Sequence, residues 1–194
     1  MHSISAVRYG DVHDTADDEV ALVRAAQAEP TAFAPLYQRY RHRVYAYLRA
    51  RTRDEEDAAD LTQQVFVQAL DALPRYRERG ATFAAWLFRI AHNALVNFYR
   101  HHRPVPLDLV PEALHPLAEQ DLEAGALRQD DLARLRPLVD ALDAAKREML
   151  ALRFAGGLTA AEIAVVIGKS EAATKKQLSR TLQTLKEQYH DDAR

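Results

Sequence analysis

The chain contains 194 residues, with 26 Lys and Arg, 28 Asp and Glu and no cysteine, and 48% of its residues are hydrophobic. This length allows one large domain or two small ones, and the lack of cysteine excludes a disulfide framework or a thiolate metal site and agrees with a cytoplasmic location. The first residues contain no apolar core of signal-peptide length, and no stretch reaches the roughly 18 apolar residues of a membrane span, so we expect no membrane insertion.

The net charge of −2 is unevenly distributed along the chain. Residues 1–103 hold 14 Lys and Arg against 13 Asp and Glu, residues 104–133 hold 1 against 7, and residues 134–194 hold 11 against 8. Lys and Arg supply most non-specific affinity for DNA because they neutralise phosphates. Two mildly basic parts joined by an acidic segment therefore predict weak DNA binding by the free chain, with a partner supplying the rest.

Helical patterns begin after a polar lead, residues 1–16, which we expect to be disordered. We predict a helix from Asp17 or Asp18 to about Glu29, ended by Pro30. A second helix follows from Thr31, with aromatic and aliphatic residues at helical spacing and arginines on its outer side.

The third predicted helix runs from Asp54 to Leu73 and begins with five carboxylates within seven residues. Negative charge is favourable there because the backbone dipole is positive at a helix N-terminus. Its outward stripe is acidic at one end and carries amides at the other, a pattern that an ordinary solvated helix face also shows.

The fourth predicted helix, from Thr82 to Arg103, carries two different stripes and ends before Pro104. Thr82 stands at the N-cap position. Residues at i, i+3 and i+4 spacing form the apolar stripe: Phe83, Trp86, Leu87, Ile90, Ala91, Ala94, Leu95 and Phe98. The opposite side carries Arg89, Asn93, Val96, Asn97 and Arg100, so hydrogen-bond donors and positive charge collect there. That side suits nucleic acid, although an amphipathic helix with a basic solvated side has the same pattern.

The helical pattern fails from Pro104 to about Asp131, where four prolines precede a run of acidic residues. We therefore predict a flexible linker between two helical domains. After the linker we expect a short helix over residues 132–142, broken early by Pro137, and a second over residues 144–154, stopped by the glycine pair that follows.

The most specific local pattern predicts a helix-turn-helix. Thr159 and Glu162 match a T-x-x-E capping box, Gly168 fits a C-terminal turn, and Ser170 caps a long following helix. Two capped helices with a glycine-containing turn are typical of DNA-binding proteins that place the second helix in the major groove, although a plain helical hairpin remains the alternative. The residues free to reach bases or phosphates are Glu171, Ala173, Lys175, Lys176, Ser179 and Arg180.

Two separated blocks together resemble one known family. The segments DAADLTQQVFVQAL and FAAWLFRIAHNALVNFYRHHR are similar to the second conserved region of bacterial sigma factors of the extracytoplasmic-function (ECF) group. The segment LDAAKREMLALRFAGGLTAAEIAVVIGKSEAATKKQLSRTLQTLK is similar to their fourth region. The resemblance implies an all-α protein with a region 2 domain over residues 17–103, a linker over 104–131 and a region 4 helix-turn-helix domain over 132–190.

The resemblance also implies a function. Such a protein binds core RNA polymerase and directs promoter-specific initiation, without catalysing a reaction itself and without a cofactor. In the family the D-L-T-Q helix docks on a coiled coil of the largest polymerase subunit. The candidate residues for this contact are Asp57, Asp60, Leu61, Gln63, Gln64 and Val67.

The family resemblance further assigns two sets of promoter contacts. In the family, the loop and helix that follow the docking helix open the −10 element and hold a base taken out of the stack. Aromatic and amide groups can receive such a base, and arginines can hold the phosphates. The candidates are Arg79, Thr82, Phe83, Trp86, Arg89, Asn93, Asn97 and Arg100. Phe83 and Trp86 also begin the apolar stripe, so the sequence leaves open whether they belong to the core. The candidates for reading duplex −35 DNA are Ser170, Glu171, Ala173, Lys175, Lys176, Ser179 and Arg180.

Several residues differ from those usual in the family, and we expect these differences to affect promoter preference and not the fold. Asn97 stands where Asp is common, His92 where Arg is common, and Ala173-Thr174 replaces Thr-Val. Family members without an extra C-terminal domain often await release from an anti-sigma protein, so we expect such a partner here.

Two other interpretations remain. A helix-turn-helix regulator that works without polymerase would explain residues 144–188 but leave residues 54–103 without a role. A metal hydrolase that uses His92, His101 and His102 is disfavoured because adjacent helical residues point about 100° apart, and neither H-E-x-x-H nor a glycine-rich phosphate loop occurs.

Overall fold

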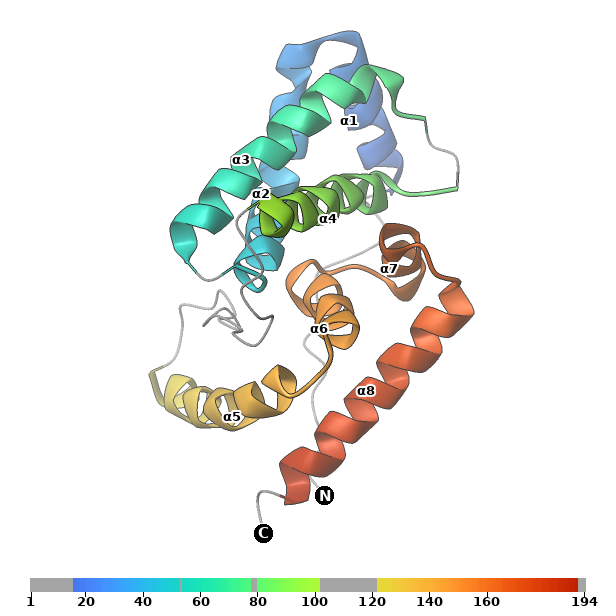
Figure 1. The fold of residues 1–194 in the computed structure, drawn as a ribbon. Coiled ribbons are helices and arrows are strands. Elements are labelled where there is room, and N and C mark those ends of the chain that lie inside the picture. The colour runs from blue at the N-terminus through green and yellow to red at the C-terminus, as the bar shows by residue number, and fades with distance from the viewer. Residues whose placement is uncertain (1–15, 53, 78–79, 102–121, 192–194) are drawn as a thin grey trace.

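The computed structural model of the protein describes residues 16–52, 54–77, 80–101 and 122–191. Within these ranges the chain forms helices, turns and loops and no strand, which confirms the all-α prediction (Figure 1). None of the described helices combines the length and the hydropathy that a membrane span requires. Residues 1–15 of the predicted N-terminal lead, Arg79 and most of the predicted linker lie outside the described residues. Ala16, the last residue of the predicted lead, is helical in the structure.

Among its described residues, the N-terminal half forms four α-helices and two short 3-10 turns. Its elements are α1 (Ala16–Ala28), η1 (Pro30–Phe33), α2 (Ala34–Arg49), α3 (Glu55–Ala72), η2 (Leu73–Arg75) and α4 (Phe83–His101). Two side-chain caps fix the helix starts that the sequence predicts. Asp54 accepts from the backbone N–H of Asp57 at 2.8 Å at the start of α3, and Thr82 accepts from that of Ala85 at 3.2 Å at the start of α4.

Aromatic rings fill the core of the N-terminal half. Phe83 lies 5.5 Å from Tyr40, 5.8 Å from Tyr76 and 5.3 Å from Trp86 between ring centroids. These rings come from α2, from the turn before α4 and from α4 itself. Tilted and edge-on contacts of this kind add stability beyond the area that they bury, so the start of α4 is held firmly.

The C-terminal half contains the predicted helix-turn-helix. Its elements are α5 (Leu122–Asp140), α6 (Ala144–Leu150), the π-helical turn η3 (Ala151–Ala155), α7 (Ala160–Ile167) and α8 (Glu171–Asp191). Thr159 and Glu162 form the complete capping box, and Gly168 ends α7 with a φ of 68°. This left-handed conformation favours glycine because it has no Cβ. Ser170 accepts from the backbone N–H of Ala173 at 3.3 Å and caps α8.

Two predicted boundaries differ from the structure. Helix α5 begins at Leu122, inside the predicted linker, and it passes through Pro137 to Asp140. It packs along α8, with Leu138 and Val139 against the core, and this packing outweighs the cost of an internal proline close to the helix end. The helix predicted over residues 144–154 is α-helical only to Leu150 and continues as the π-helical turn η3.

The two halves pack against each other around α4. Figure 1 shows α2 and α3 on one side of α4, with α6 and α7 on the other, and α4 packs directly on α7. Phe88 is therefore fully buried, although it lies outside the predicted apolar stripe. Its ring lies 5.6 Å from that of Tyr47 on α2, and Gly156 of the C-terminal half lies beside it.

Candidate nucleic-acid and protein interfaces

The outer face of α3 is open to solvent. Asp60, Gln63 and Gln64 are exposed, and Val67 exposes 61% of its surface. Asp57 is half-buried, and Leu61, at 2% exposed, lies in the core beneath this face. The face therefore offers carboxylates, amides and one aliphatic side chain to a partner, while Leu61 anchors the helix from below.

The outer face of α4 carries four of the residues predicted to contact nucleic acid. Arg89, Asn93, Asn97 and Arg100 are exposed, and Arg100 donates to the side-chain oxygen of Asn97 at 3.0 Å. Guanidinium and amide groups can bind both phosphates and bases, so this face offers four such side chains to a nucleic-acid strand.

The start of α4 is less accessible than its outer face. Phe83 is 2% exposed and belongs to the aromatic core, and Trp86 is half-buried against it. Thr82 is exposed, but its hydroxyl donates to Glu162 on α7 at 2.7 Å while it also caps α4. The structure thus holds the first turn of α4 against the helix-turn-helix.

The N-terminal part of α8 is fully open. Each of the seven predicted residues is exposed: Ser170, Glu171, Ala173, Lys175, Lys176, Ser179 and Arg180. Thr174, Leu178 and Thr181 are buried on the opposite side and fix the helix to the domain. Lys146 of α6 borders a cleft with Lys176 and Arg180, so three cations line one side of this helix. An exposed second helix with cations beside it is the arrangement expected of a helix that enters the major groove.

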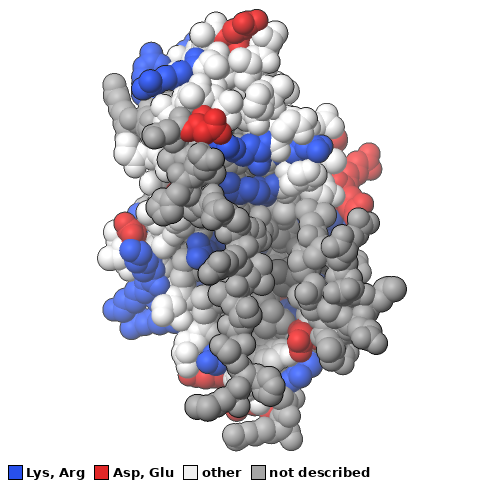
Figure 2. Space-filling view, turned by 180° about the vertical axis from the view of Figure 1, so that it is seen from behind, with Lys and Arg blue, Asp and Glu red and all other residues white. Residues whose placement is uncertain are grey.

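On the face in Figure 2, the described Lys and Arg form separate patches with acidic side chains between them. Affinity for DNA grows with the number of phosphates neutralised together, so separate patches bind DNA more weakly than one continuous basic surface would.

A buried polar cluster, which sequence patterns did not predict, joins the two halves. The carboxylate of Glu148 on α6 lies 2.6 Å from the Tyr47 hydroxyl, 2.8 Å from Nδ1 of His92 and 3.1 Å from Nε of Arg51. The Arg51 contact is an ion pair without the alignment of a hydrogen bond. Tyr47 and Arg51 belong to α2 and the turn after it, and His92 belongs to α4. We call these four residues the Glu148 cluster.

The Glu148 cluster favours an ionised carboxylate. Burial alone would raise the pKa of Glu148, but the hydrogen bond with His92, the positive charge of Arg51 and donation from Tyr47 together lower it below its usual value. Burial and the nearby carboxylate raise the pKa of Tyr47 well above its usual value, so its hydroxyl stays protonated and donates. The cluster therefore surrounds one buried anion with two hydrogen-bond partners, Tyr47 and His92, and one cation, Arg51.

A second polar contact between the halves involves Arg43 on α2. Its Nε donates to the carbonyl oxygen of Gly156 at 2.9 Å, and its Nη2 donates to that of Gly157 at 3.2 Å. The guanidinium also lies over the rings of Tyr40 and Phe88. The sequence placed Arg43 among outer arginines because its partners lie more than a hundred residues away.

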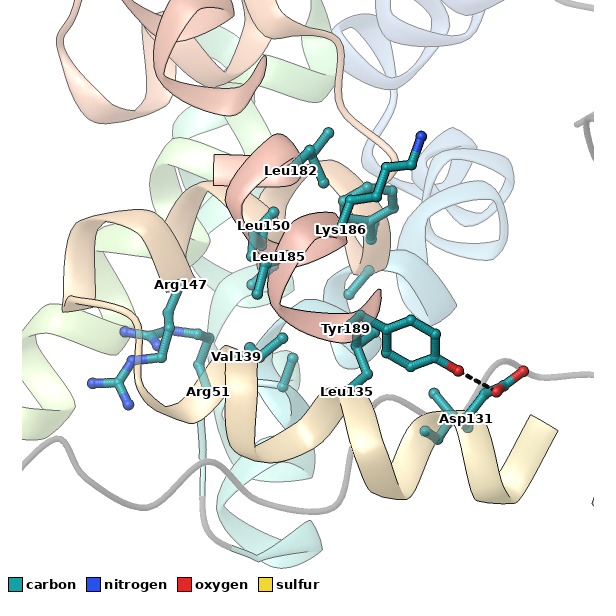
Figure 3. Close-up of a pocket in the computed structure, with 15 residues that line it drawn as sticks. Arg51, Asp131, Leu135, Val139, Arg147, Leu150, Leu182, Leu185, Lys186 and Tyr189 are labelled. Carbon is teal, nitrogen blue, oxygen red and sulfur yellow. Dashed lines mark hydrogen bonds between the residues drawn. The ribbon is translucent and has the colours of Figure 1, made fainter. Parts of the chain in front are cut away.

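An apolar groove of about 570 Å³ lies between α5, η3 and α8 (Figure 3). Leucine and valine side chains line its base, namely Leu132, Leu135, Val139, Leu150, Leu182 and Leu185. Arg51 and Arg147 stand at one end and Lys186 on a side, while Tyr189 donates to Asp131 at the other end. This lining suits an amphipathic segment that carries acidic groups.

Comparisons with protein families match both halves of the chain. The family model for sigma-70 region 2 matches residues 36–105, and that for sigma-70 region 4 matches residues 132–185. The first range contains the outer faces of α3 and α4, and the second contains the helix-turn-helix.

Individual relatives match across both halves. The ECF RNA polymerase sigma factor BldN of Streptomyces coelicolor is 35% identical over 175 residues, which cover 89% of this chain and 66% of that protein. The ECF RNA polymerase sigma factor SigD of Mycobacterium tuberculosis is 32% identical over 177 residues, which cover 88% of this chain and 82% of SigD. The solved structure of CnrH in complex with the cytosolic domain of CnrY superposes with a TM-score of 0.64 and 26% identity, covering 90% of this chain and 98% of that one.

Proposed function

The chain belongs to the ECF group of bacterial RNA polymerase sigma factors, and on this premise we propose that it binds core RNA polymerase and directs it to specific promoters. One observation carries the proposal: a single chain combines an open acidic and amide-bearing face on α3 with an exposed, capped recognition helix. It would act by binding, in the cytoplasm where polymerase works, and without catalysis of its own.

The proposal assigns the α3 face to core polymerase. Asp60, Gln63, Gln64 and Val67 make the contact, with Asp57 at its edge and Leu61 supporting the helix from the core. Asp60→Arg is expected to lower the affinity for core polymerase about tenfold, which is about 1.4 kcal/mol, because it reverses a charge within the contact. Titration of labelled core polymerase measures the change, with circular dichroism to check helix content.

A charge reversal elsewhere provides the control for this variant. Glu187→Arg alters an exposed carboxylate on α8 and should leave polymerase affinity unchanged. Equal affinities for wild type and Asp60→Arg would remove the α3 face from the proposal.

The proposal assigns the two sets of DNA contacts to α4 and α8. Outer donors of α4, namely Arg89, Asn93, Asn97 and Arg100, together with Arg79 and Thr82, hold the opened −10 strand, and Trp86 offers the edge of a half-buried ring to an unstacked base. Phe83 supports Trp86 from the core. The exposed start of α8 reads −35 DNA in the major groove.

Salt dependence tests the assignment of α8. Arg180→Ala or Lys175→Ala should weaken promoter binding by the polymerase complex and reduce its salt slope by about 1, because one phosphate or base contact is lost. Lys186→Ala, near the other end of α8, serves as the control and should keep the slope. A slope equal to that of the wild type in both variants would rule out these contacts.

Run-off transcription tests the function as a whole. The purified chain with core polymerase should initiate transcription on a subset of genomic fragments. Comparison of these fragments then identifies the −10 and −35 sequences that the chain recognises. A folded chain that binds a short duplex but ignores core polymerase would instead be a polymerase-independent regulator.

We further propose that an anti-sigma protein restrains the chain. Support comes from the similar solved structure, in which CnrH is bound to the cytosolic domain of CnrY. The apolar groove with its basic rim is the candidate place for an amphipathic helix of such a partner. Leu182→Glu should free transcription from the inhibitor by placing a charge in the groove, whereas Gln183→Glu on the adjacent, exposed position should not.

A further inference from the structure

We propose that the Glu148 cluster is a latch that holds the free chain closed and must open before both DNA-binding helices can engage one promoter. The need for opening rests on the proposed function, but the latch itself can be tested on the free chain. The four residues come from both halves, and every contact within the cluster to Glu148 crosses from one half to the other.

The closed chain is too small to span a promoter. The −10 and −35 elements are about 25 base pairs apart, which is roughly 85 Å of B-form DNA at 34 to 36 Å per turn. A compact chain of 194 residues has a radius of gyration of about 16 Å and is therefore about 40 Å across. The halves must separate for α4 and α8 to reach their elements together.

Contacts between the halves also restrain the first turn of α4. Thr82 donates to Glu162, and Glu162 at the same time completes the capping box of α7. The two helix starts therefore share one carboxylate. In the closed chain, DNA approaching Thr82 must displace this contact, whereas the start of α8 is exposed without any rearrangement.

The Glu148 cluster has the chemistry of a reversible and specific latch. An apolar contact tolerates small shifts, but a buried carboxylate with two hydrogen-bond partners and one paired cation is satisfied in one arrangement of the halves. Glu148 is 8% exposed, so removing its charge leaves the Arg51 guanidinium without its buried partner. When the halves separate, water hydrates all four groups, which offsets part of the loss of their mutual contacts.

The arrangement of the halves can be measured without polymerase. Because the chain has no cysteine, spin labels at His42→Cys on α2 and Phe154→Cys on η3, both exposed and on elements that pack together across the two halves, report one distance. The wild type should give a single short distance. Glu148→Gln should add a broad population at longer distances, with the ratio of closed to open chains falling about a hundredfold, as expected for loss of one member of a buried pair.

Two further variants make this test decisive. His92→Ala removes one donor from α4 at a partly exposed position and should widen the distances less than Glu148→Gln does. Glu187→Gln neutralises an exposed carboxylate on α8 and should keep the wild-type distance. The latch is overturned if both cluster variants keep the short distance or if Glu187→Gln widens it equally.

Binding to core polymerase then separates the latch from the proposed function. If only open chains bind, Glu148→Gln should bind core polymerase more tightly than the wild type, since the apparent affinity scales with the open fraction. A variant that opens but does not bind core polymerase would overturn the proposed function and leave the latch standing. A wild-type chain that stays at the short distance while bound would overturn the latch and leave the function standing.

Discussion

The two helices that carry the candidate DNA contacts differ in how the fold presents them. The start of α8 is exposed, and its own domain covers only its inner side, whereas α4 is covered on two sides and its first turn bonds to Glu162. Both helices have similar caps and similar amphipathic patterns in the sequence. The difference shows that packing between the two halves determines which of the two candidate DNA-binding helices is accessible in the free chain.

The variant with the largest expected effect alters the side of α4 that packs against the C-terminal half. Phe88→Ala should lower the free energy of unfolding by about 3–5 kcal/mol, because Phe88 is fully buried between Tyr47 and the C-terminal half. Urea denaturation followed by circular dichroism measures this loss. On α8, Leu182→Ala should change stability by less than about 0.5 kcal/mol, since Leu182 is 41% exposed. Similar losses in both variants would contradict the comparison.

A smaller effect tests the close approach of the two halves. A Cβ at position 156 would lie 2.8 Å from the ring of Phe88 and 2.7 Å from the carbonyl oxygen of Leu152. Gly156→Ala should therefore destabilise the chain by about 1–3 kcal/mol through overpacking. The melting temperature measures the effect, and combination with Phe88→Ala should relieve part of it, because the smaller side chain leaves space. Strict additivity would show that the ring is not the obstacle.

Acid should open the closed chain through Glu148. Its pKa is lowered in the closed chain, so its contribution is complete above its usual pKa of about 4.5 and is lost as the pH falls through the lower, closed-state value. The facing groups are Tyr47 and Arg51 from α2 and the turn after it, and His92 from α4. The spin-label distance should lengthen over this acidic range, and Glu148→Gln, already open, should show no such transition.

The smallest expected effect compares the caps of the two helices. Ser170→Ala removes only the cap of α8 and should cost about 1 kcal/mol. Thr82→Ala removes the cap of α4 and also the contact with Glu162, so it should cost about 0.5 kcal/mol more. A double-mutant cycle between Thr82→Ala and Glu162→Gln measures that coupling by denaturant titration. A coupling of zero would mean that the shared carboxylate does not restrain α4.

Much of the fold follows from local patterns. The starts of α4, α7 and α8 agree with the predicted caps, because a cap and its partner lie within three residues of each other. Helix α3 begins within the acidic run that predicts it, whereas α1 begins at Ala16, just before the predicted Asp17 or Asp18. Helical spacing also predicts which residues of α3 and α8 face solvent. The roles of their exposed residues in binding stay predictions, since spacing indicates which side chains face solvent and not what they contact.

Other features could not follow from local patterns. Four prolines and an acidic run argue against a helix before residue 132, yet α5 begins at Leu122. Trp86 and Phe83 have the same apolar pattern, but only Phe83 is fully enclosed by rings from other elements.

The sequence by itself determined the all-α architecture, the helix-turn-helix and the open faces of α3 and α8, because spacing and capping act within a few residues. Only the tertiary structure decided that α4 is covered on a second side and that Glu148 is buried. Its partners Tyr47 and His92 lie 101 and 56 residues away along the chain. A glutamate on an amphipathic helix is ordinarily exposed, and only the donors brought in by the other domain make its burial favourable.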